Sequence, residues 1–260
     1  MNNTIYLGII GNYKGHLSGA ENVAEHDVPN GIFVINRDHV ETVTTGSTIK
    51  YPQQGGDVDI EPEFVIHCKI GYQQGKVSSL SPQEMTIGND FTIRTLANSD
   101  KISQRKAWGE KSKGINHQWW PMEEYIAANY GDNISLISYI ERDGLFQRVT
   151  PPVTCSDTKL FCEHLIAWVI DAINHQQREG MYEQILPELI AQGYPDELIL
   201  YTGAPIYTEW GEENFLQAGD KVHIAAFYNE LVDIDDVMFT LLNHKHENNQ
   251  HLLSFMQEII

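Results

Sequence analysis

Short apolar runs separated by turn residues dominate the first half of the chain. Runs of this length that are rich in β-branched and aromatic residues are typical of strands. They predict strands over residues 5–10, 31–36, 42–45, 48–51 and 63–70. The apolar run over residues 85–88 leads into Asn89-Asp90. That pair favours the start of a helix, because both side chains can accept hydrogen bonds from unpaired backbone N–H groups.

The second half of the chain contains helical spacing as well as strands. Apolar positions at 165, 166, 168, 169, 170, 172 and 173 predict a helix over residues 162–174. A second helix is expected over residues 181–192, ending at Gly193. Strands are expected over 197–201 and 221–227, and helices over 235–242 and 252–260. The polar segment between these last helices holds His244, His246 and His251, and we interpret it as a solvated connection.

This pattern indicates a β-rich α+β protein. The sequence contains no internal repeat and no Pro/Gly/Ser linker that would divide it. We therefore expect a small N-terminal lobe at residues 1–50 and a larger domain over residues 51–260, packed together as a single compact unit.

Charge narrows the range of functions. The 260 residues include 36 Asp and Glu but only 17 Lys and Arg, which gives a formal net charge of −19. This excess repels phosphate, so we expect neither a nucleic-acid partner nor a membrane surface. There is no apolar run of about 18 residues and no signal peptide, and the three cysteines form no even disulfide framework. These features predict a reduced, cytoplasmic protein.

Two acidic motifs could bind a cation. Glu61 and Glu63 flank Pro62, and residues i and i+2 of a strand point to the same face. Paired carboxylates repel each other unless a cation lies between them, and oxygen-only ligands suit Mg²⁺, Mn²⁺ or Ca²⁺. Asp90 precedes Arg94 by four residues, a spacing that shares one face of a helix. Taken alone, each motif favours solvent-exposed charge over a cation site.

Three further segments contain candidate chemistry. A basic island from Lys101 to Lys113 contains five of the 17 basic residues, and either binds an anionic substrate or forms an exposed loop. His16, flanked by glycines and followed by Glu21, is either a general base or part of a surface loop. The segment 202–205 (TGAP) follows a predicted strand and reads as a tight turn whose backbone could approach a ligand.

The order of these segments resembles the fumarylacetoacetate hydrolase family over roughly residues 9–230. The matching segments are Asn12-Tyr13-x-x-His16, residues 31–36, residues 59–64, Ile87-Gly88-Asn89-Asp90-x-x-x-Arg94, Lys113-Gly114, residues 202–205 and residues 215–220. The most specific part is the paired glutamates followed by the Gly-Asn-Asp-x-x-x-Arg segment, whereas residues 120–160 match poorly. The resemblance implies rolled mixed β-sheets with peripheral helices, a homodimer, and a divalent cation, first of all Mg²⁺, held by Glu61, Glu63 and Asp90.

The resemblance also implies a reaction. Members of the family act on small anionic β-dicarbonyl compounds and 2-oxo acids such as acylpyruvates or oxaloacetate. They hydrolyse C–C bonds, decarboxylate or isomerise, with the metal stabilising an enolate. The implied catalytic residues are His16, Glu21, Arg94 and Lys113. The implied substrate contacts are Tyr13, Arg94, Lys113 and Thr202.

The sequence departs from the family pattern at several of these positions. Gly19 replaces the glutamate expected three residues after His16, Ala97 replaces a glutamine, and Ala204 replaces a threonine. Because the residues that activate water are the ones altered, decarboxylation and isomerisation rank close behind hydrolysis. The alternative is a catalytically silent protein with the same fold that binds a metal or a small dicarboxylate.

Overall fold

The computed structural model describes residues 3–15, 26–44, 46–52, 56–96, 99–106, 109–245 and 248–260. The strands in these ranges are β1 (Thr4–Ile10), β2 (Gly31–Ile35), β3 (Val40–Val43), β4 (Thr48–Ile49), β5 (Val58–Asp59), β6 (Pro62–Gln73), β7 (Lys76–Asp90), β8 (Thr92–Ile93), β9 (Lys113–Asn116), β10 (Trp120–Pro121), β11 (Ile134–Arg142), β12 (Leu145–Val153), β13 (Glu197–Tyr201), β14 (Lys221–Tyr228) and β15 (Leu252–Ile259). The helices are α1 (Ile102–Lys106), α2 (Ala127–Tyr130), α3 (Cys162–His175), α4 (Leu186–Ala191), α5 (Glu209–Glu213) and α6 (Ile234–Leu242), with short 3₁₀ turns η1 (Arg37–His39) and η2 (Cys155–Asp157).

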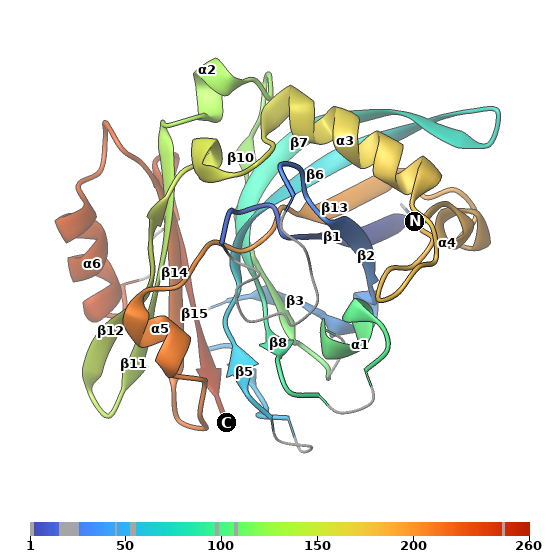
Figure 1. The fold of residues 1–260 in the computed structure, drawn as a ribbon. Coiled ribbons are helices and arrows are strands. Elements are labelled where there is room, and N and C mark those ends of the chain that lie inside the picture. The colour runs from blue at the N-terminus through green and yellow to red at the C-terminus, as the bar shows by residue number, and fades with distance from the viewer. Residues whose placement is uncertain are drawn as a thin grey trace.

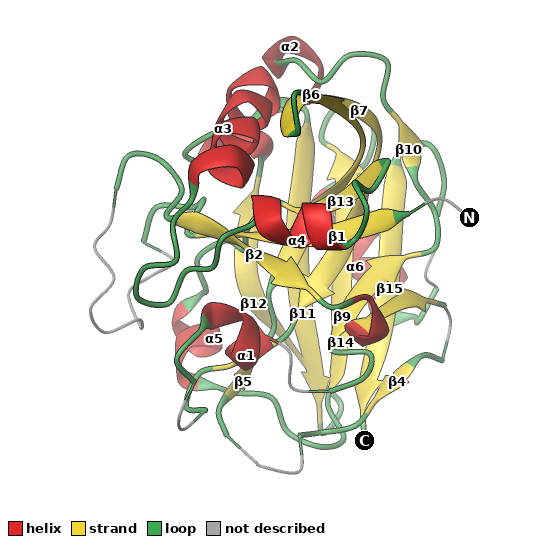
Figure 2. Ribbon diagram, turned by 90° about the vertical axis from the view of Figure 1, so that its right-hand side faces the viewer, coloured by secondary structure: helices red, strands yellow, loops and turns green. Residues whose placement is uncertain are grey.

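Two mixed sheets form the body of the molecule (Figures 1 and 2). The larger sheet has the order β2-β1-β13-β6-β7-β9-β3, with β10 paired to β7, and the smaller has the order β12-β11-β14-β15-β4. Parallel pairs occur in both, between β1 and β13, β3 and β9, and β4 and β15. Apolar side chains from both sheets pack into one buried cluster, and the helices lie at the periphery. The β-rich α+β class and the rolled mixed sheets expected from the sequence are confirmed.

The β6–β7 hairpin is the longest feature of the larger sheet, with strands of 12 and 15 residues. Its register pairs Pro62 with Asn89 and Glu63 with Gly88. Antiparallel pairing in this register places the start of β6 beside the end of β7. The two acidic motifs of the sequence therefore lie next to each other in space.

Two predicted helices form where the spacing placed them. In α3 the buried residues Cys162, Leu165, Val169 and Ile173 recur every three or four positions and face the main core. In α6, Val237 and Leu241 pack on the outer face of the smaller sheet, against a separate cluster that includes Ala225 of β14 (Figure 1).

Two other helix predictions are wrong. The segment 252–260 forms strand β15, because it pairs along its length with β14 and at its end with β4. Leu253 faces the main core while Leu252 joins the outer cluster, so both faces of this strand are covered. No helix begins at Asn89-Asp90, because β7 continues through Asp90. The helix expected over 181–192 is shorter and spans only α4.

Residues 1–50, the segment predicted to form a small N-terminal lobe, contribute strands to both sheets. Strands β1, β2 and β3 lie within the larger sheet, and β4 completes the smaller one. Apolar residues of this segment, such as Ile5, Leu7 and Ile49, belong to the main core. The sheet pairing uses partner strands that are distant in sequence, so it leaves no mark on the local pattern.

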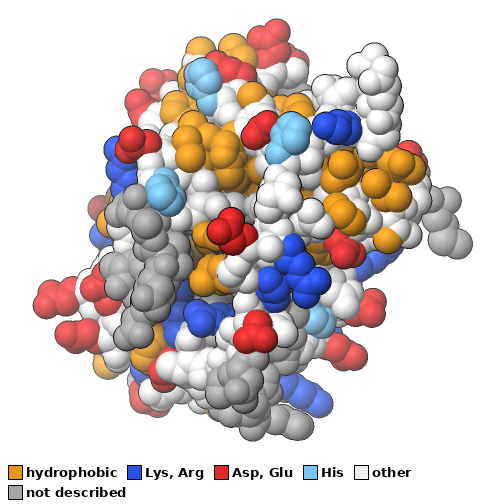
Figure 3. Space-filling model, turned by 45° about the vertical axis from the view of Figure 1, so that its right-hand side comes forward, with side chains coloured by type: hydrophobic (Ala, Val, Ile, Leu, Met, Phe, Trp, Pro, Cys, Tyr) orange, Lys and Arg blue, Asp and Glu red, His pale blue; other side chains and the backbone are white. Residues whose placement is uncertain are grey.

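Most of the negative charge lies on the surface. Figure 3 shows acidic side chains scattered over one face among basic and apolar ones. Among the described residues, the buried acidic side chains are Asp59, Glu61, Glu63, Asp90 and Asp220. Asp220 pairs with Arg142, whereas the other four lie together at the end of the β6–β7 hairpin. No helix among the described residues is long and apolar enough to cross a membrane.

The three cysteines, Cys68, Cys155 and Cys162, are free and buried. Burial raises the pKa of Cys68 and of Cys162 to about 12, so the reactive thiolate is scarce at neutral pH. We expect the native protein to resist alkylation by iodoacetamide at mildly alkaline pH, and the denatured protein to be alkylated at all three thiols. Intact-mass spectrometry checks this, and rapid labelling of any native thiol would contradict it.

Candidate metal and substrate site

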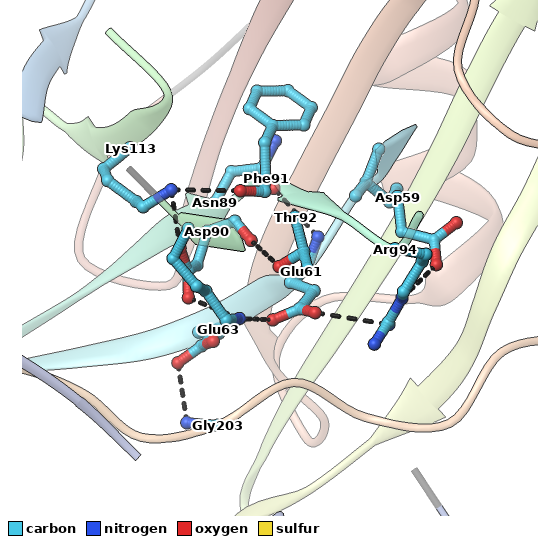
Figure 4. Close-up of polar contacts among 12 residues, drawn as sticks. Asp59, Glu61, Glu63, Asn89, Asp90, Phe91, Thr92, Arg94, Lys113 and Gly203 are labelled. Carbon is cyan, nitrogen blue, oxygen red and sulfur yellow. Dashed lines mark hydrogen bonds and ion pairs between the residues drawn. The ribbon is translucent and has the colours of Figure 1, made fainter. Parts of the chain in front are cut away.

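Three carboxylates meet at the end of the β6–β7 hairpin. Glu61 directly precedes β6, Glu63 lies within it, and Asp90 is the last residue of β7. One oxygen from each side chain lies within 4.8 Å of the others, and all three side chains are buried (Figure 4). The structure therefore brings together the three residues that the sequence singled out. We call this group the carboxylate corner.

Backbone contacts hold the carboxylate corner in place. The amide of Asp90 donates to the carbonyl of Glu61 at 2.9 Å, and the amide of Glu61 donates to the side-chain oxygen of Asn89 at 3.0 Å. The amide of Gly203 donates to Oε2 of Glu63 at 2.6 Å (Figure 4). Gly203 has a φ of +101°, a conformation that favours glycine. The turn after β13 thus approaches a carboxylate of the corner with its backbone.

Three basic side chains surround the carboxylate corner. The ammonium of Lys106, at the end of α1, contacts Glu61 and lies 2.7 Å from Oδ2 of Asp90. Nζ of Lys113 lies 2.9 Å from Oδ1 of Asp90. Nη2 of Arg94 lies 3.2 Å from Oε1 of Glu61. Figure 4 shows Lys113 and Arg94 on opposite sides of the acidic group.

Asp59 is the fourth acidic side chain at this site. Its Oδ2 accepts a hydrogen bond from Nε of Arg94 at 2.6 Å, and the Tyr207 hydroxyl accepts one from Nη2 of the same guanidinium at 3.1 Å. Four acidic and three basic side chains therefore share this site, which leaves one net negative charge when all seven are ionised.

Burial shifts the proton affinities at the site. It raises the pKa of Glu63 well above its usual range, and the charges of Asp90 and Glu61 raise it further, against the opposing effect of Lys106. Burial also lowers the pKa of Lys113, although Asp90 partly offsets this. For Lys106 the balance is reversed: burial alone would lower its pKa, but the neighbouring carboxylates raise it above the usual value. Lys106 is therefore a charged ammonium held among acids.

The other residues predicted at the site lie close to it, with different contacts. The ammonium of Lys113 is buried and also donates to the Phe91 carbonyl at 3.0 Å, so it orients Asp90. The hydroxyl of Thr202 donates to the Phe64 carbonyl at 3.0 Å and ties β13 to β6. Tyr13 is buried, and burial raises its pKa well above the usual value, with a smaller contribution from Glu63. Arg94 is the most exposed of the three basic side chains, at 26%.

Sequence reasoning missed three participants. Asp59 lies two residues before Glu61, just as Glu61 lies two residues before Glu63. The spacing of the acidic residues could therefore have indicated it. Lys106 belongs to the basic island, but nothing in that island distinguishes a buried lysine from exposed ones. Tyr207 lies far along the chain in a segment without a motif. His16 and Glu21 lie outside the described residues.

Comparison of the sequence with family models assigns the chain to a family. A model described as a family of unknown function (DUF5718) matches residues 21–259, so the chain belongs to that family. No curated protein matches the sequence.

Solved structures with the same fold identify the architecture. A protein from Oleispira antarctica, described as a candidate fumarylacetoacetate isomerase/hydrolase, matches with a TM-score of 0.61 at 13% identity, over 99% of this chain and 93% of that one. A 5-carboxymethyl-2-hydroxymuconate delta-isomerase from Mycobacterium smegmatis matches with a TM-score of 0.57 at 16% identity, over 98% of this chain and 78% of that one. The fold is thus that of fumarylacetoacetate hydrolase-like proteins, shared at low sequence identity.

The chemistry of the carboxylate corner fits a hard divalent cation. Its donors are oxygens only, they are buried, and three of them lie within 4.8 Å of one another. In this structure the ammonium of Lys106 contacts two of the three carboxylates. A cation at this point would therefore take the place of that ammonium, with Glu61, Glu63 and Asp90 as its protein ligands.

Proposed function

We propose that the protein is a divalent-cation-dependent enzyme that acts on a small β-dicarbonyl compound or 2-oxo acid, such as an acylpyruvate or oxaloacetate. The observation that carries this proposal is the convergence of Glu61, Glu63 and Asp90 beside a cationic side chain. The fold supports it, because structures with the same fold include a 5-carboxymethyl-2-hydroxymuconate delta-isomerase. The cation would supply Lewis-acid stabilisation of an enolate, which hydrolysis, decarboxylation and isomerisation share.

The protein's own residues have distinct parts in this proposal. Arg94 is partly exposed and its guanidinium is planar, so it can bind the carboxylate of a substrate next to the corner. Asp59 and Tyr207 fix its orientation through the two hydrogen bonds described above. Lys113 holds Asp90, and Gly203 holds Glu63, so both carboxylates are positioned before a ligand arrives.

Turnover measured against a panel of substrates tests the proposal. Oxaloacetate and acylpyruvates are incubated with the protein in Mg²⁺ or Mn²⁺, and again after removal of divalent metal. We expect metal-dependent turnover that falls at least about a hundredfold in Glu61→Gln, because loss of a ligand weakens both metal binding and activity. Glu84→Gln is the matched control, because Glu84 lies in β7, the strand that ends at Asp90, with a half-exposed side chain. Its turnover should equal that of the wild type.

One observation favours the alternative of a catalytically silent binding protein. The ammonium of Lys106 already compensates much of the charge of the carboxylate corner without a metal. If this arrangement persists with ligand bound, the protein would bind a dicarboxylate through Arg94 without chemistry. Calorimetry separates the two functions: dicarboxylate binding that needs no metal, together with no turnover of any panel member, would replace the enzyme proposal with this one.

A further inference from the structure

A second group of metal-ligating side chains lies on the smaller sheet. Glu141 near the end of β11, His223 in β14 and His244 just after α6 each offer one ligand atom, and these atoms lie within 4.8 Å of one another. We propose that these three residues form a Zn²⁺ site that is independent of the carboxylate corner.

The fold places the three side chains on one face. In the register of β11 and β14, Tyr139 pairs with His223 and Glu141 with Lys221, so Glu141 and His223 are diagonal neighbours on the same face. Helix α6 covers this face through Val237 and Leu241 (Figure 1). His244 follows directly after the helix and reaches the sheet at the point where Glu141 and His223 meet. Residues about 80 and 20 positions apart in the chain therefore converge through ordinary packing.

The distances fit a metal better than direct hydrogen bonds. Both imidazole Nε2 atoms approach the same carboxylate oxygen, Oε2 of Glu141, at 3.6 Å for His223 and 3.3 Å for His244. Charge-assisted N–H···O hydrogen bonds are shorter, at about 2.7–2.9 Å. Zinc binds imidazole nitrogen and carboxylate oxygen at about 2.0–2.1 Å, which separates two ligands of a tetrahedral site by about 3.3–3.4 Å. The observed separations are close to that tetrahedral edge.

Neighbouring side chains fix the orientations of Glu141 and His223. Its other oxygen, Oε1, lies 3.1 Å from Nζ of Lys221, which leaves Oε2 directed at the two histidines. A hydrogen-bond partner on the second oxygen of a ligating carboxylate fixes its orientation. His223 is fully buried beside the ring of Phe146, with ring centroids 4.9 Å apart, so its imidazole cannot swing away. Glu141 and His223 are therefore already oriented before a metal binds.

The donor set points to zinc and to an open coordination position. Two imidazoles with one carboxylate suit Zn²⁺ better than Mg²⁺ or Ca²⁺, which prefer oxygen alone. The side chain of His244 is 44% exposed, so solvent reaches the site and can provide the fourth ligand. The overall charge of −19 favours the approach of a cation from solution.

Metal titration of the full-length protein tests the proposal. Metal-free protein is titrated with Co²⁺, and separately with Zn²⁺, in excess Mg²⁺, which saturates an oxygen-only site but competes poorly at a site containing imidazole. We expect the visible absorption of tetrahedral Co²⁺ and uptake of about one equivalent, with Zn²⁺ displacing the Co²⁺. His244→Ala and the isosteric Glu141→Gln should each weaken the affinity at least about tenfold. Because His244 is exposed, its variant should remain folded, which circular dichroism verifies.

Two control variants separate this site from other binding. His175→Ala removes an exposed histidine at the end of α3, and Glu61→Gln disables the carboxylate corner. Both should leave the Co²⁺ spectrum and affinity unchanged. The proposal fails if Co²⁺ and Zn²⁺ do not bind, if binding survives His244→Ala and Glu141→Gln unaltered, or if Glu61→Gln abolishes it. In that case the three side chains form only an ion-paired cluster.

Discussion

Replacement of Lys106 by methionine is expected to destabilise the metal-free protein by about 3–5 kcal/mol, since removal of one partner of a buried ion pair leaves an uncompensated charge. The ammonium contacts Glu61 and Asp90, and both carboxylates are buried. Methionine retains most of the length and the apolar stem of lysine, and loses the ammonium together with its contact over the ring of Phe33. The loss therefore reports on the charge rather than on a cavity.

The same variant should gain more stability from divalent metal than the wild type does. In Lys106→Met the carboxylate corner lacks the ammonium that contacts both Glu61 and Asp90, so Mg²⁺ or Mn²⁺ should bind more tightly and restore most of the lost stability. Urea denaturation in the presence of chelator and of excess Mg²⁺, together with calorimetry, measures both effects. Lys111→Met is the matched control from the same basic island. Lys111 is half exposed beside Glu41, and its loss should cost less than about 1 kcal/mol, with or without metal.

The outcome distinguishes two descriptions of this site. A loss of stability that Mg²⁺ and Mn²⁺ leave unchanged would show that the carboxylate corner is a structural ion-pair network. It would also remove the basis for metal-dependent chemistry. Recovery with metal would instead make Lys106 an internal counter-ion that a divalent cation displaces.

Local sequence patterns predicted the strands and helices in which one pattern of burial continues along the whole element. Strands β1, β13 and β14 are short apolar runs, β6 contains one over residues 63–70, and α3 has one apolar stripe facing the core. Strand β15 was mistaken for a helix because both of its faces are covered, so its apolar residues do not alternate. No local sequence signal shows which strands pair across the chain. The placing of residues 1–50 in both sheets therefore has no local signal either.

The candidate site, like the fold, could be predicted only in part. The order of the motifs resembles the fumarylacetoacetate hydrolase family, and that resemblance implied a shared cation for Glu61, Glu63 and Asp90. Strand alternation alone placed only Glu61 and Glu63 on one face. The counter-ion Lys106 was not predictable, since lysine is rarely buried and its five-residue helix has no distinctive pattern. The cluster of Glu141, His223 and His244 was also invisible, because its members come from three separate elements and meet only in the folded chain.

Gly88→Ala is expected to destabilise the protein by about 1–3 kcal/mol or more and to weaken metal binding at the carboxylate corner, because it overpacks a rigid site. A Cβ at this position would lie 2.7 Å from the carbonyl oxygen of Gly114 and 2.8 Å from atoms of Tyr201 and Val65. The carbonyl belongs to strand β9, which pairs with β7, so it cannot move without displacing the strand.

This substitution links the packing of the sheet to the geometry of the site. Gly88 lies two residues before Asp90, and β9 begins with Lys113, whose ammonium holds Asp90. Separation of β7 from β9 would therefore shift both members of that pair. Gly109→Ala is the control, since nothing lies within 4 Å of its added Cβ, and it should be neutral or stabilising by up to about 1 kcal/mol.

Urea denaturation and calorimetric Mg²⁺ binding, measured on the two glycine variants and the wild type, test this link. We expect Gly88→Ala to lose stability and Mg²⁺ affinity together, while Gly109→Ala keeps both. A Gly88→Ala protein with wild-type stability would contradict the close packing of β7 on β9. A destabilised variant with unchanged Mg²⁺ affinity would show that the carboxylate corner tolerates displacement of β7, and so does not depend on the tight approach that the glycine permits.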